Sequence, residues 1–157
     1  MNELLRAEQD VWYRYAVSIL RRRDAACDAT QETGLRFIRE IARFDGRSSV
    51  RTWGLGIALN VCREMQRRVP FTNHDAAEPV DRQPAPAAVA DTAEQIDAVR
   101  LAVLHLSDRQ REAVVLRHFE QLSVRDTAAV MGCAEGTVKA TLSQAMSNLK
   151  LKLGAFE

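Results

Sequence analysis

An amide and two guanidiniums recur at helical spacing in the first half of the chain, at Asn60, Arg63 and Arg67. At about 100° per residue, these three side chains share one narrow face of a helix. An amide can hydrogen-bond a base edge while guanidiniums hold phosphates, so the set fits a nucleic-acid interface. The same spacing also fits an ordinary solvated helix face, and the pattern alone leaves both interpretations open.

The segment just before this helix combines an aromatic residue, a glycine and an arginine, in Phe44-Asp-Gly-Arg-Ser-Ser-Val50. Aromatic rings beside basic side chains are suited to stacking on unpaired bases. The alternative is that Phe44 only caps a hydrophobic core and that Arg47 is solvated.

A second candidate DNA-reading unit lies near the carboxyl end. A short helix opened by Ser123 is followed by the turn Gly132-Cys133-Ala134 and by a longer helix from about Glu135 to Leu149. This spacing is typical of a helix-turn-helix, whose second helix enters the major groove. A hairpin of two helices packed only for stability is the alternative.

Helical spacing of apolar residues predicts the elements that must position these groups. Three helices are expected at about 3–22, 24–44 and 48–68, the last capped by Ser48 or Ser49, and four more follow residue 95. Ser107-Asp-Arg-Gln110 predicts a capping box at the start of the second of these four. The residues expected to face the core are Leu5, Trp12, Tyr15, Ile19, Phe37, Ile38, Ile41, Val50, Trp53, Ile57, Val61, Met65, Val114, Val115, Phe119, Ala128, Val130, Met131, Val138, Leu142, Ala145 and Leu149.

All four prolines fall within residues 70–95, which show no helical or strand periodicity and read as a flexible linker. The expected fold is therefore all-α, with two small helical domains at 1–69 and 96–157. Formal charge supports this division. Residues 1–69 carry 13 basic and 9 acidic side chains, residues 70–95 carry 1 and 5, and residues 96–157 carry 8 and 7. The net charge of the whole chain is only +1 because the acidic linker offsets the positive charge of the amino-terminal domain.

The composition argues against several other classes of protein. No apolar run reaches the ~20 residues of a membrane span, and no signal peptide follows Met1. Cys27, Cys62 and Cys133 are widely spaced, so we expect core thiols in a reducing cytosol rather than a metal site or disulfides. No phosphate-binding loop and no nucleophile–base motif is present, so we expect neither an enzyme nor a cofactor.

Three segments resemble region 2 of extracytoplasmic-function sigma factors: Asp24-Ala-Ala-Cys-Asp-Ala-Thr-Gln-Glu-Thr33, Phe44-Asp-Gly-Arg-Ser-Ser-Val-Arg-Thr-Trp53 and Ile57-Ala-Leu-Asn60. Two further segments are similar to region 4 of that family: Leu106-Ser-Asp-Arg-Gln-Arg-Glu-Ala-Val-Val-Leu-Arg117 and Leu122-Ser-Val-Arg-Asp-Thr-Ala-Ala-Val-Met-Gly-Cys-Ala-Glu-Gly-Thr-Val-Lys139. The likeness covers nearly the whole chain, in the family's order.

The resemblance implies a dissociable subunit of bacterial RNA polymerase that directs promoter recognition and transcription initiation, in a stress or environmental response. The implied partners are the polymerase core (its clamp helices and flap), promoter DNA and an anti-sigma factor, in the cytoplasm. Core binding would use Asp28, Gln31, Glu32 and Arg36, although Asp28 and Glu32 also fit a solvated face. Contacts to the −10 element would use Phe44, Arg47, Ser48, Ser49, Trp53, Asn60, Arg63 and Arg67. Contacts to the −35 element would use Glu135, Gly136, Thr137, Lys139, Ala140, Thr141 and Gln144.

The chain departs from the family pattern at several positions. Gly34 replaces an aromatic residue, while Gly54 and Gly56 stand where leucine and arginine are usual. Two glycines inside a helix each cost ~1 kcal/mol relative to alanine, which indicates close packing or a soft helix. Ala134, Ala140-Thr141 and Gln144 alter the expected DNA-reading helix, so binding to the −35 element is expected to be weaker or differently specific. A stand-alone helix-turn-helix regulator, usually dimeric on a palindrome, is the alternative function.

Overall fold

The computed structural model describes residues 2–68 and 90–154, and every regular element in these ranges is a helix. The elements are α1 (Asn2–Leu20), α2 (Arg23–Glu40), the 3-10 turn η1 (Ile41–Arg43), α3 (Val50–Arg68), α4 (Ala90–Leu104), α5 (Asp108–Val114), the π-helical turn η3 (Val115–Phe119), α6 (Val124–Met131) and α7 (Glu135–Gly154). The all-α expectation is confirmed. The expected flexible linker falls largely on residues 69–89, which lie outside the described ranges, and α4 begins within its last residues.

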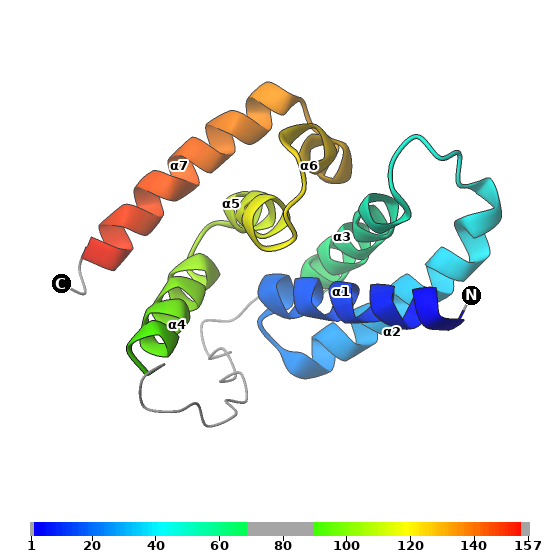
Figure 1. Cartoon of the computed structure of the whole chain (residues 1–157), viewed down its shortest axis with the longest axis horizontal. Coiled ribbons are helices and arrows are strands. Elements are labelled where there is room, and N and C mark those ends of the chain that lie inside the picture. Colours follow the sequence, from blue (N-terminus) through cyan, green and yellow to red (C-terminus); the bar gives the residue numbers. More distant parts are fainter. Residues whose placement is uncertain (1, 69–89, 155–157) are drawn as a thin grey trace.

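The amino-terminal domain, residues 2–68, is a bundle in which α1, α2 and α3 all pack on one another (Figure 1). Its core contains Trp12, Tyr15 and Ile19 from α1, which are at most 1% exposed, and Phe37 from α2. Leu55 and Leu59 of α3 close the core from the third side. The apolar spacing therefore identified Trp12, Tyr15, Ile19 and Phe37 correctly, whereas Leu55 and Leu59 are fully buried core residues that the spacing did not indicate.

A glycine allows α1 and α3 to approach closely. A Cβ atom at Gly54 would lie 2.8 Å from Nε1 of Trp12, a separation that packed side chains do not reach. The large indole of Trp12, 0% exposed, thus rests on the backbone of α3. The close-packing explanation for Gly54 is confirmed, whereas a Cβ atom at Gly56 would meet nothing within 4 Å.

The carboxy-terminal domain, residues 90–154, packs α4, α5 and α6 on the long helix α7. Val138, Ala145 and Leu149 form the buried stripe of α7, as the spacing predicted. The α6–α7 pair is a helix-turn-helix: Oγ of Ser123 accepts a hydrogen bond from the Asp126 backbone at 3.0 Å. Gly132 then ends α6 in the left-handed conformation (φ 69°) that glycine adopts without strain.

Several local expectations are wrong. Ile38 is 57% exposed because it lies on the outer face of α2, and Phe119 is 42% exposed because the π turn carries it to the edge of a cavity described below. Cys27 is exposed on α2, so only Cys62 of the three thiols is fully buried.

The predicted capping box also fails. Ser107 occupies the cap position of α5 but makes no side-chain capping hydrogen bond. The amide oxygen of Gln110 instead accepts a hydrogen bond from Asn148 of α7, at 3.0 Å, which turns this side chain away from the helix start.

The two domains contact each other directly. Helix α3 packs against α6, and α1 packs against α5, so the helix-turn-helix lies beside the amino-terminal bundle (Figure 1). The outer side of α7 points away from that bundle. None of the helices in the described part of the chain is long and apolar enough to cross a membrane.

Candidate nucleic-acid interface

A row of four aromatic rings connects the loop before α3 to the centre of the amino-terminal domain. The ring centroids of Phe44 and Trp53 are 5.1 Å apart, those of Trp53 and Phe37 are 5.0 Å apart, and those of Phe37 and Trp12 are 5.1 Å apart. All three pairs are tilted, an arrangement that aromatic pairs favour. Phe44 is half-buried, so its ring is both anchored to the core and accessible at the loop.

The loop itself has a defined local geometry. Gly46 has a φ of +73°, which requires a glycine-like residue at this turn. The backbone of Arg47 donates a hydrogen bond to Asp45 at 3.0 Å, while its side chain is 89% exposed. Oγ of Ser49 caps α3 by accepting a hydrogen bond from the Thr52 backbone at 3.0 Å, so the predicted cap is Ser49. The loop therefore holds an aromatic ring at the start of α3, together with an exposed guanidinium that lies 3.2 Å from the Asp45 carboxylate.

A cavity of about 300 Å³ lies at the junction of this loop, α3 and α6. It brings together three of the predicted side chains, Ser48, Trp53 and Asn60, and Asn60 is exposed toward solvent. The sequence reasoning did not assign the other residues that line it: Glu40, Thr52, Gly56, Ile57, Ala129 and Val130. The two residues of α6 carry no sequence signal for this role, because they come from the other domain.

The two arginines predicted on this face of α3 have different environments. Arg67 is exposed, as expected for a phosphate contact. Arg63 is 24% exposed and donates hydrogen bonds to both carboxylate oxygens of Glu112, at 3.0 and 2.8 Å. This pairing raises the pKa of the Arg63 guanidinium. Arg63 is therefore paired with a carboxylate of the protein itself, whereas Arg67 is exposed to solvent.

A second ionic group bridges the domains at Glu120, which follows the π turn. Its carboxylate is 4% exposed and lies 3.0 Å from Arg51 of α3 and 3.6 Å from Arg14 of α1. Glu8 lies in the same region with a buried Oε2 that has no hydrogen-bond partner. Burial is the largest influence on the Glu8 carboxyl and raises its pKa. The positive charge of Arg51 acts in the opposite direction, and the negative charge of Glu120 adds to the increase. The sequence reasoning missed this group, since its members are far apart along the chain.

The polar residues predicted to bind the polymerase core lie together on α2. Asp28 and Gln31 are exposed and Glu32 is partly exposed. Arg36 donates to Glu32 at 2.7 Å and, as a fork, to both oxygens of Glu64 at 2.9 and 2.8 Å. Arg36 thus also joins α2 to α3, a structural role that the sequence did not indicate.

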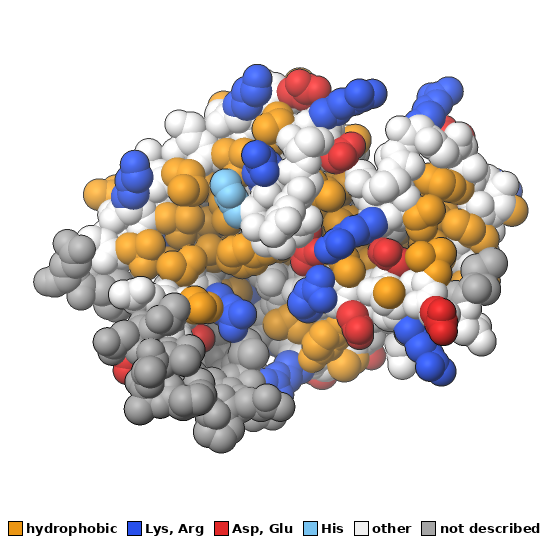
Figure 2. Space-filling view, viewed as in Figure 1, with side chains coloured by type: hydrophobic (Ala, Val, Ile, Leu, Met, Phe, Trp, Pro, Cys, Tyr) orange, Lys and Arg blue, Asp and Glu red, His pale blue; other side chains and the backbone are white. Residues whose placement is uncertain are grey.

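The predicted −35 contacts share the outer face of α7. Glu135, Gly136, Thr137, Lys139, Ala140 and Gln144 are exposed and Thr141 is partly exposed. They lie opposite the buried stripe at Val138 and Ala145. Figure 2 shows a few separate Lys and Arg side chains over this region, with hydrophobic and other side chains between them. The residues predicted to contact the −35 element therefore face solvent.

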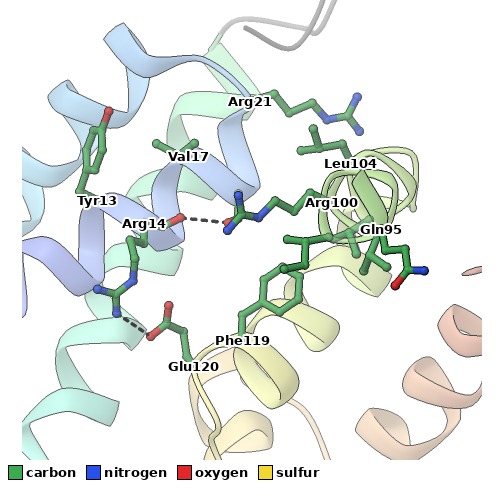
Figure 3. A pocket seen from close by; sticks show the side chains of 13 residues that line it. Tyr13, Arg14, Val17, Arg21, Gln95, Arg100, Leu104, Phe119 and Glu120 are labelled. Atoms are coloured by element: carbon green, nitrogen blue, oxygen red, sulfur yellow. Dashed lines mark hydrogen bonds and ion pairs between the residues drawn. The ribbon is translucent and has the colours of Figure 1, made fainter. Parts of the chain in front are cut away.

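A larger cavity, about 740 Å³, separates α1 from α4 on the other side of the domain junction. Figure 3 shows Val17 of α1 on one side of it and Leu104 of α4 on the other, with Phe119 at one end and the Arg100 side chain reaching across toward α1. No three His, Cys, Asp or Glu side chains in residues 2–68 and 90–154 are grouped so as to hold a metal ion.

Comparison with known proteins identifies both domains. The family model for Sigma-70 region 2 matches residues 4–69, and that for Sigma-70 region 4 matches residues 96–149. The probable RNA polymerase sigma-C factor of Mycobacterium bovis is 38% identical over 147 residues, which cover 90% of this chain and 76% of that protein. The ECF RNA polymerase sigma factor SigM of Mycobacterium tuberculosis is 33% identical over 156 residues, covering 98% of this chain and 76% of SigM.

Solved structures show the same fold. The sigma factor RpoE of Bartonella quintana, in complex with the anti-sigma factor NepR, matches with a TM-score of 0.75 and 27% identity, over 98% of this chain and 96% of that one. CnrH, in complex with the cytosolic domain of CnrY, matches in fold with a TM-score of 0.72 and 22% identity, over 99% and 88% of the two chains. The chain belongs to the extracytoplasmic-function family of RNA polymerase sigma factors and acts in transcription initiation.

Proposed function

We propose that the two domains of this sigma factor divide promoter recognition between them. The amino-terminal domain binds the polymerase core and opens the −10 element, and the carboxy-terminal domain reads the −35 element as duplex. The chain itself catalyses no reaction. The observation that carries this proposal is the cavity in which Ser48, Trp53 and Asn60 meet, beside the anchored ring of Phe44.

The proposed −10 site works by capturing an unpaired base. Phe44 and Trp53 offer aromatic surface for stacking, and the Asn60 amide offers a donor and an acceptor to a base edge. Arg47 precedes the cavity residues in the sequence and Arg67 follows them. Both arginines are exposed and suit the phosphates that flank the captured base. Holding the base offsets an unstacking cost of a few kcal/mol, so opening needs no chemical energy source.

The proposed core-binding surface is the polar side of α2. Asp28, Gln31 and Glu32 present two carboxylates and an amide to solvent, and this set suits a partner with basic side chains. Arg36 holds the carboxylate of Glu32 in position, since it donates to this group at 2.7 Å. Arg36 is thus a positioning residue in the proposal.

The proposed −35 reader is the outer face of α7. Lys139 suits a phosphate and Gln144 suits an adenine edge. Gly136 and Ala140 leave room for close approach of the helix to the groove, and Thr137 and Thr141 supply hydroxyl groups. Glu135 stands at the helix start, where its charge would disfavour a nearby phosphate and so restrict the register of binding.

Regulation by an inhibitor is part of the proposal. RpoE of Bartonella quintana was crystallised with an anti-sigma factor, and its likeness to this chain spans both domains. We infer that an anti-sigma factor binds this chain as well, and that the sigma factor acts in the cytoplasm in an environmental or stress response.

Reconstitution with bacterial core polymerase tests the proposal. Run-off transcription from fragments of a bacterial genome should yield discrete transcripts only when the sigma factor is added. Glu32→Lys should weaken core binding in a pull-down, while Glu3→Lys, the same charge change on exposed α1, should not. Absence of both core binding and promoter-dependent transcripts would contradict the assignment.

A further inference from the structure

The cavity of about 740 Å³ between α1 and α4 has a mainly apolar lining. Its apolar side chains come from α1, the π turn and α4: Val17, Phe119, Ile96, Val99, Val103 and Leu104. Ligand pockets in proteins commonly measure about 300–1,000 Å³ and combine an apolar lining with a few polar groups. The size and lining of this cavity therefore fit a small and largely apolar molecule.

Helix α4 directs large apolar side chains toward this space without covering them. Ile96 is 47% exposed and Val99 is 36% exposed, although both line the cavity. Val103, about one turn further along the helix, is buried in the core. A molecule that fills the cavity would remove the surface of Ile96 and Val99 from water, which favours its binding.

Three arginine side chains surround the same cavity: Arg14 from α1, Arg21 just after the end of α1, and Arg100 from α4. In Figure 3, Arg100 lies between Arg21 above it and the guanidinium of Arg14 below it. Among the described residues that line the cavity, Glu120 carries the only carboxylate. That carboxylate is almost fully buried and lies 3.0 Å from Arg51 and 3.6 Å from Arg14. Three arginines against one paired glutamate leave the lining positively charged.

The surroundings of Arg21 add to this positive charge. Burial lowers the pKa of its guanidinium, the charge of Arg111 lowers it as well, and Asp108 acts in the opposite direction. A negative charge nearby favours the charged form of a guanidinium. An anion beside Arg21 would therefore offset both unfavourable effects.

We propose that this cavity binds a free amphipathic carboxylate of the fatty-acid class. The hydrocarbon chain lies between α1 and α4, and the carboxylate pairs with Arg21 and Arg100, whose planar forks of donors match its two oxygens. The ligand then touches both domains, since α1 and α4 belong to different ones. The inference does not depend on the proposed promoter contacts.

Charge argues against a second copy of the chain as the occupant. In a symmetric dimer, the same surface of both subunits meets at the interface. Arg14, Arg21 and Arg100 of one copy would then face the same arginines of the other, and like charges repel.

Two substitutions of exposed side chains in the full chain test the site, each with a matched control. Ile96→Gln replaces an apolar lining residue, and its control is Leu101→Gln, an exposed residue of α4 outside the lining. Arg100→Gln removes a lining charge, and its control is Arg125→Gln, an exposed residue of α6 outside the lining. Circular dichroism checks that each variant keeps its helices.

Isothermal titration calorimetry with octanoate, decanoate, decanol and decylamine measures the binding. Decanoate should bind once per chain and roughly tenfold more tightly than octanoate, because it buries two more CH₂ groups. Decanol should bind at least fivefold more weakly than decanoate, and decylamine more weakly still. Ile96→Gln should weaken decanoate binding roughly tenfold and Arg100→Gln roughly fivefold, whereas both controls should match the parent protein. Arg100→Gln should leave decanol binding unchanged.

Three results overturn the inference: no saturable binding of decanoate, equal affinity for decanoate and decylamine, or controls that weaken binding as much as the cavity variants do. Sedimentation of the parent chain tests the second copy as occupant. A dimer that Ile96→Gln dissociates and that decanoate leaves intact would assign the cavity to the second copy and would equally overturn the inference.

Discussion

Arg63 of α3 and Glu112 of α5 form a two-pronged hydrogen-bonded ion pair, at 3.0 and 2.8 Å, that joins the two domains of this sigma factor. Glu112 is 3% exposed and Arg63 is 24% exposed, so the carboxylate depends on this partner far more than the guanidinium does. Arg63, a predicted DNA contact, therefore also stabilises the carboxy-terminal domain through its pairing with Glu112.

Arg63→Met should therefore be more harmful than Arg67→Met on the same helix. Removing the partner of a buried charge costs ~3 kcal/mol, reduced here because Arg63 is partly exposed and Arg109 lies 3.9 Å from the same carboxylate. We expect a loss of ~1–2 kcal/mol for Arg63→Met and less than ~0.5 kcal/mol for the exposed Arg67. Urea unfolding followed by circular dichroism measures both, and equal losses would argue that the pair contributes nothing.

Gly54 and Gly56 form a natural test of packing on α3. Gly54→Ala forces a methyl group to 2.8 Å from Trp12, so we expect a loss of ~1–3 kcal/mol. Gly56→Ala meets open space and should stabilise the helix by up to ~1 kcal/mol. Both tryptophans of the chain, Trp12 and Trp53, lie in the amino-terminal domain, so their fluorescence reports its unfolding. A shift of the same sign for both variants would contradict the close contact.

Glu8→Gln should raise the melting temperature at pH 7. The folded-state pKa of Glu8 lies above its ordinary value of 4.5, because its carboxylate is buried and its Oε2 has no partner. Its contribution to stability is complete below pH 4.5 and is lost as the pH rises through the raised pKa. The gain from glutamine should thus be present at pH 7 and vanish near pH 4. Thermal melts across this range measure it, with exposed Glu3→Gln as control, and a gain that grows at low pH would contradict it.

Glu64→Gln should have the opposite pH dependence. The Arg36 fork holds the pKa of the Glu64 carboxyl below its ordinary value of 4.5. The resulting stability is complete above pH 4.5 and is lost as the pH falls through the lowered pKa. The two side chains are 26% and 33% exposed, so we expect a loss of only ~0.5–1 kcal/mol at neutral pH. Tryptophan fluorescence in urea measures it, and a similar loss in Glu40→Gln, on exposed α2 surface, would mean that the ion pair is not the cause.

The sequence predicted what depends on neighbouring residues along the chain. Trp12, Tyr15 and Ile19 recur at helical spacing and are buried, and Ser49 caps its helix with an adjacent backbone group. Prediction from the sequence failed where contacts with residues far along the chain determine the position of a side chain. Gln110 leaves its expected cap to bind Asn148, and Phe119 is carried outward by a π turn that has no periodic signature.

The candidate site shows the same limit. Phe44, Trp53 and Asn60 could be identified because they flank one turn or lie on one helix. The pairing of Arg63 with Glu112, 49 residues away, could not, because the approach of the two domains is set by their tertiary contacts. Likewise, nothing local marks Ala129 and Val130 as neighbours of Asn60.

Opening of the −10 element by Asn60→Ala holoenzyme tests the central claim most directly. The fluorescence of 2-aminopurine in the −10 element reports opening, and co-purification with core polymerase reports assembly in the same sample. Loss of one base contact costs ~1–3 kcal/mol, so opening should fall roughly tenfold while core binding is unchanged. The exposed control Arg6→Ala on α1 should leave both unchanged. Normal opening by Asn60→Ala, or an equal loss of opening and core binding, would contradict the account.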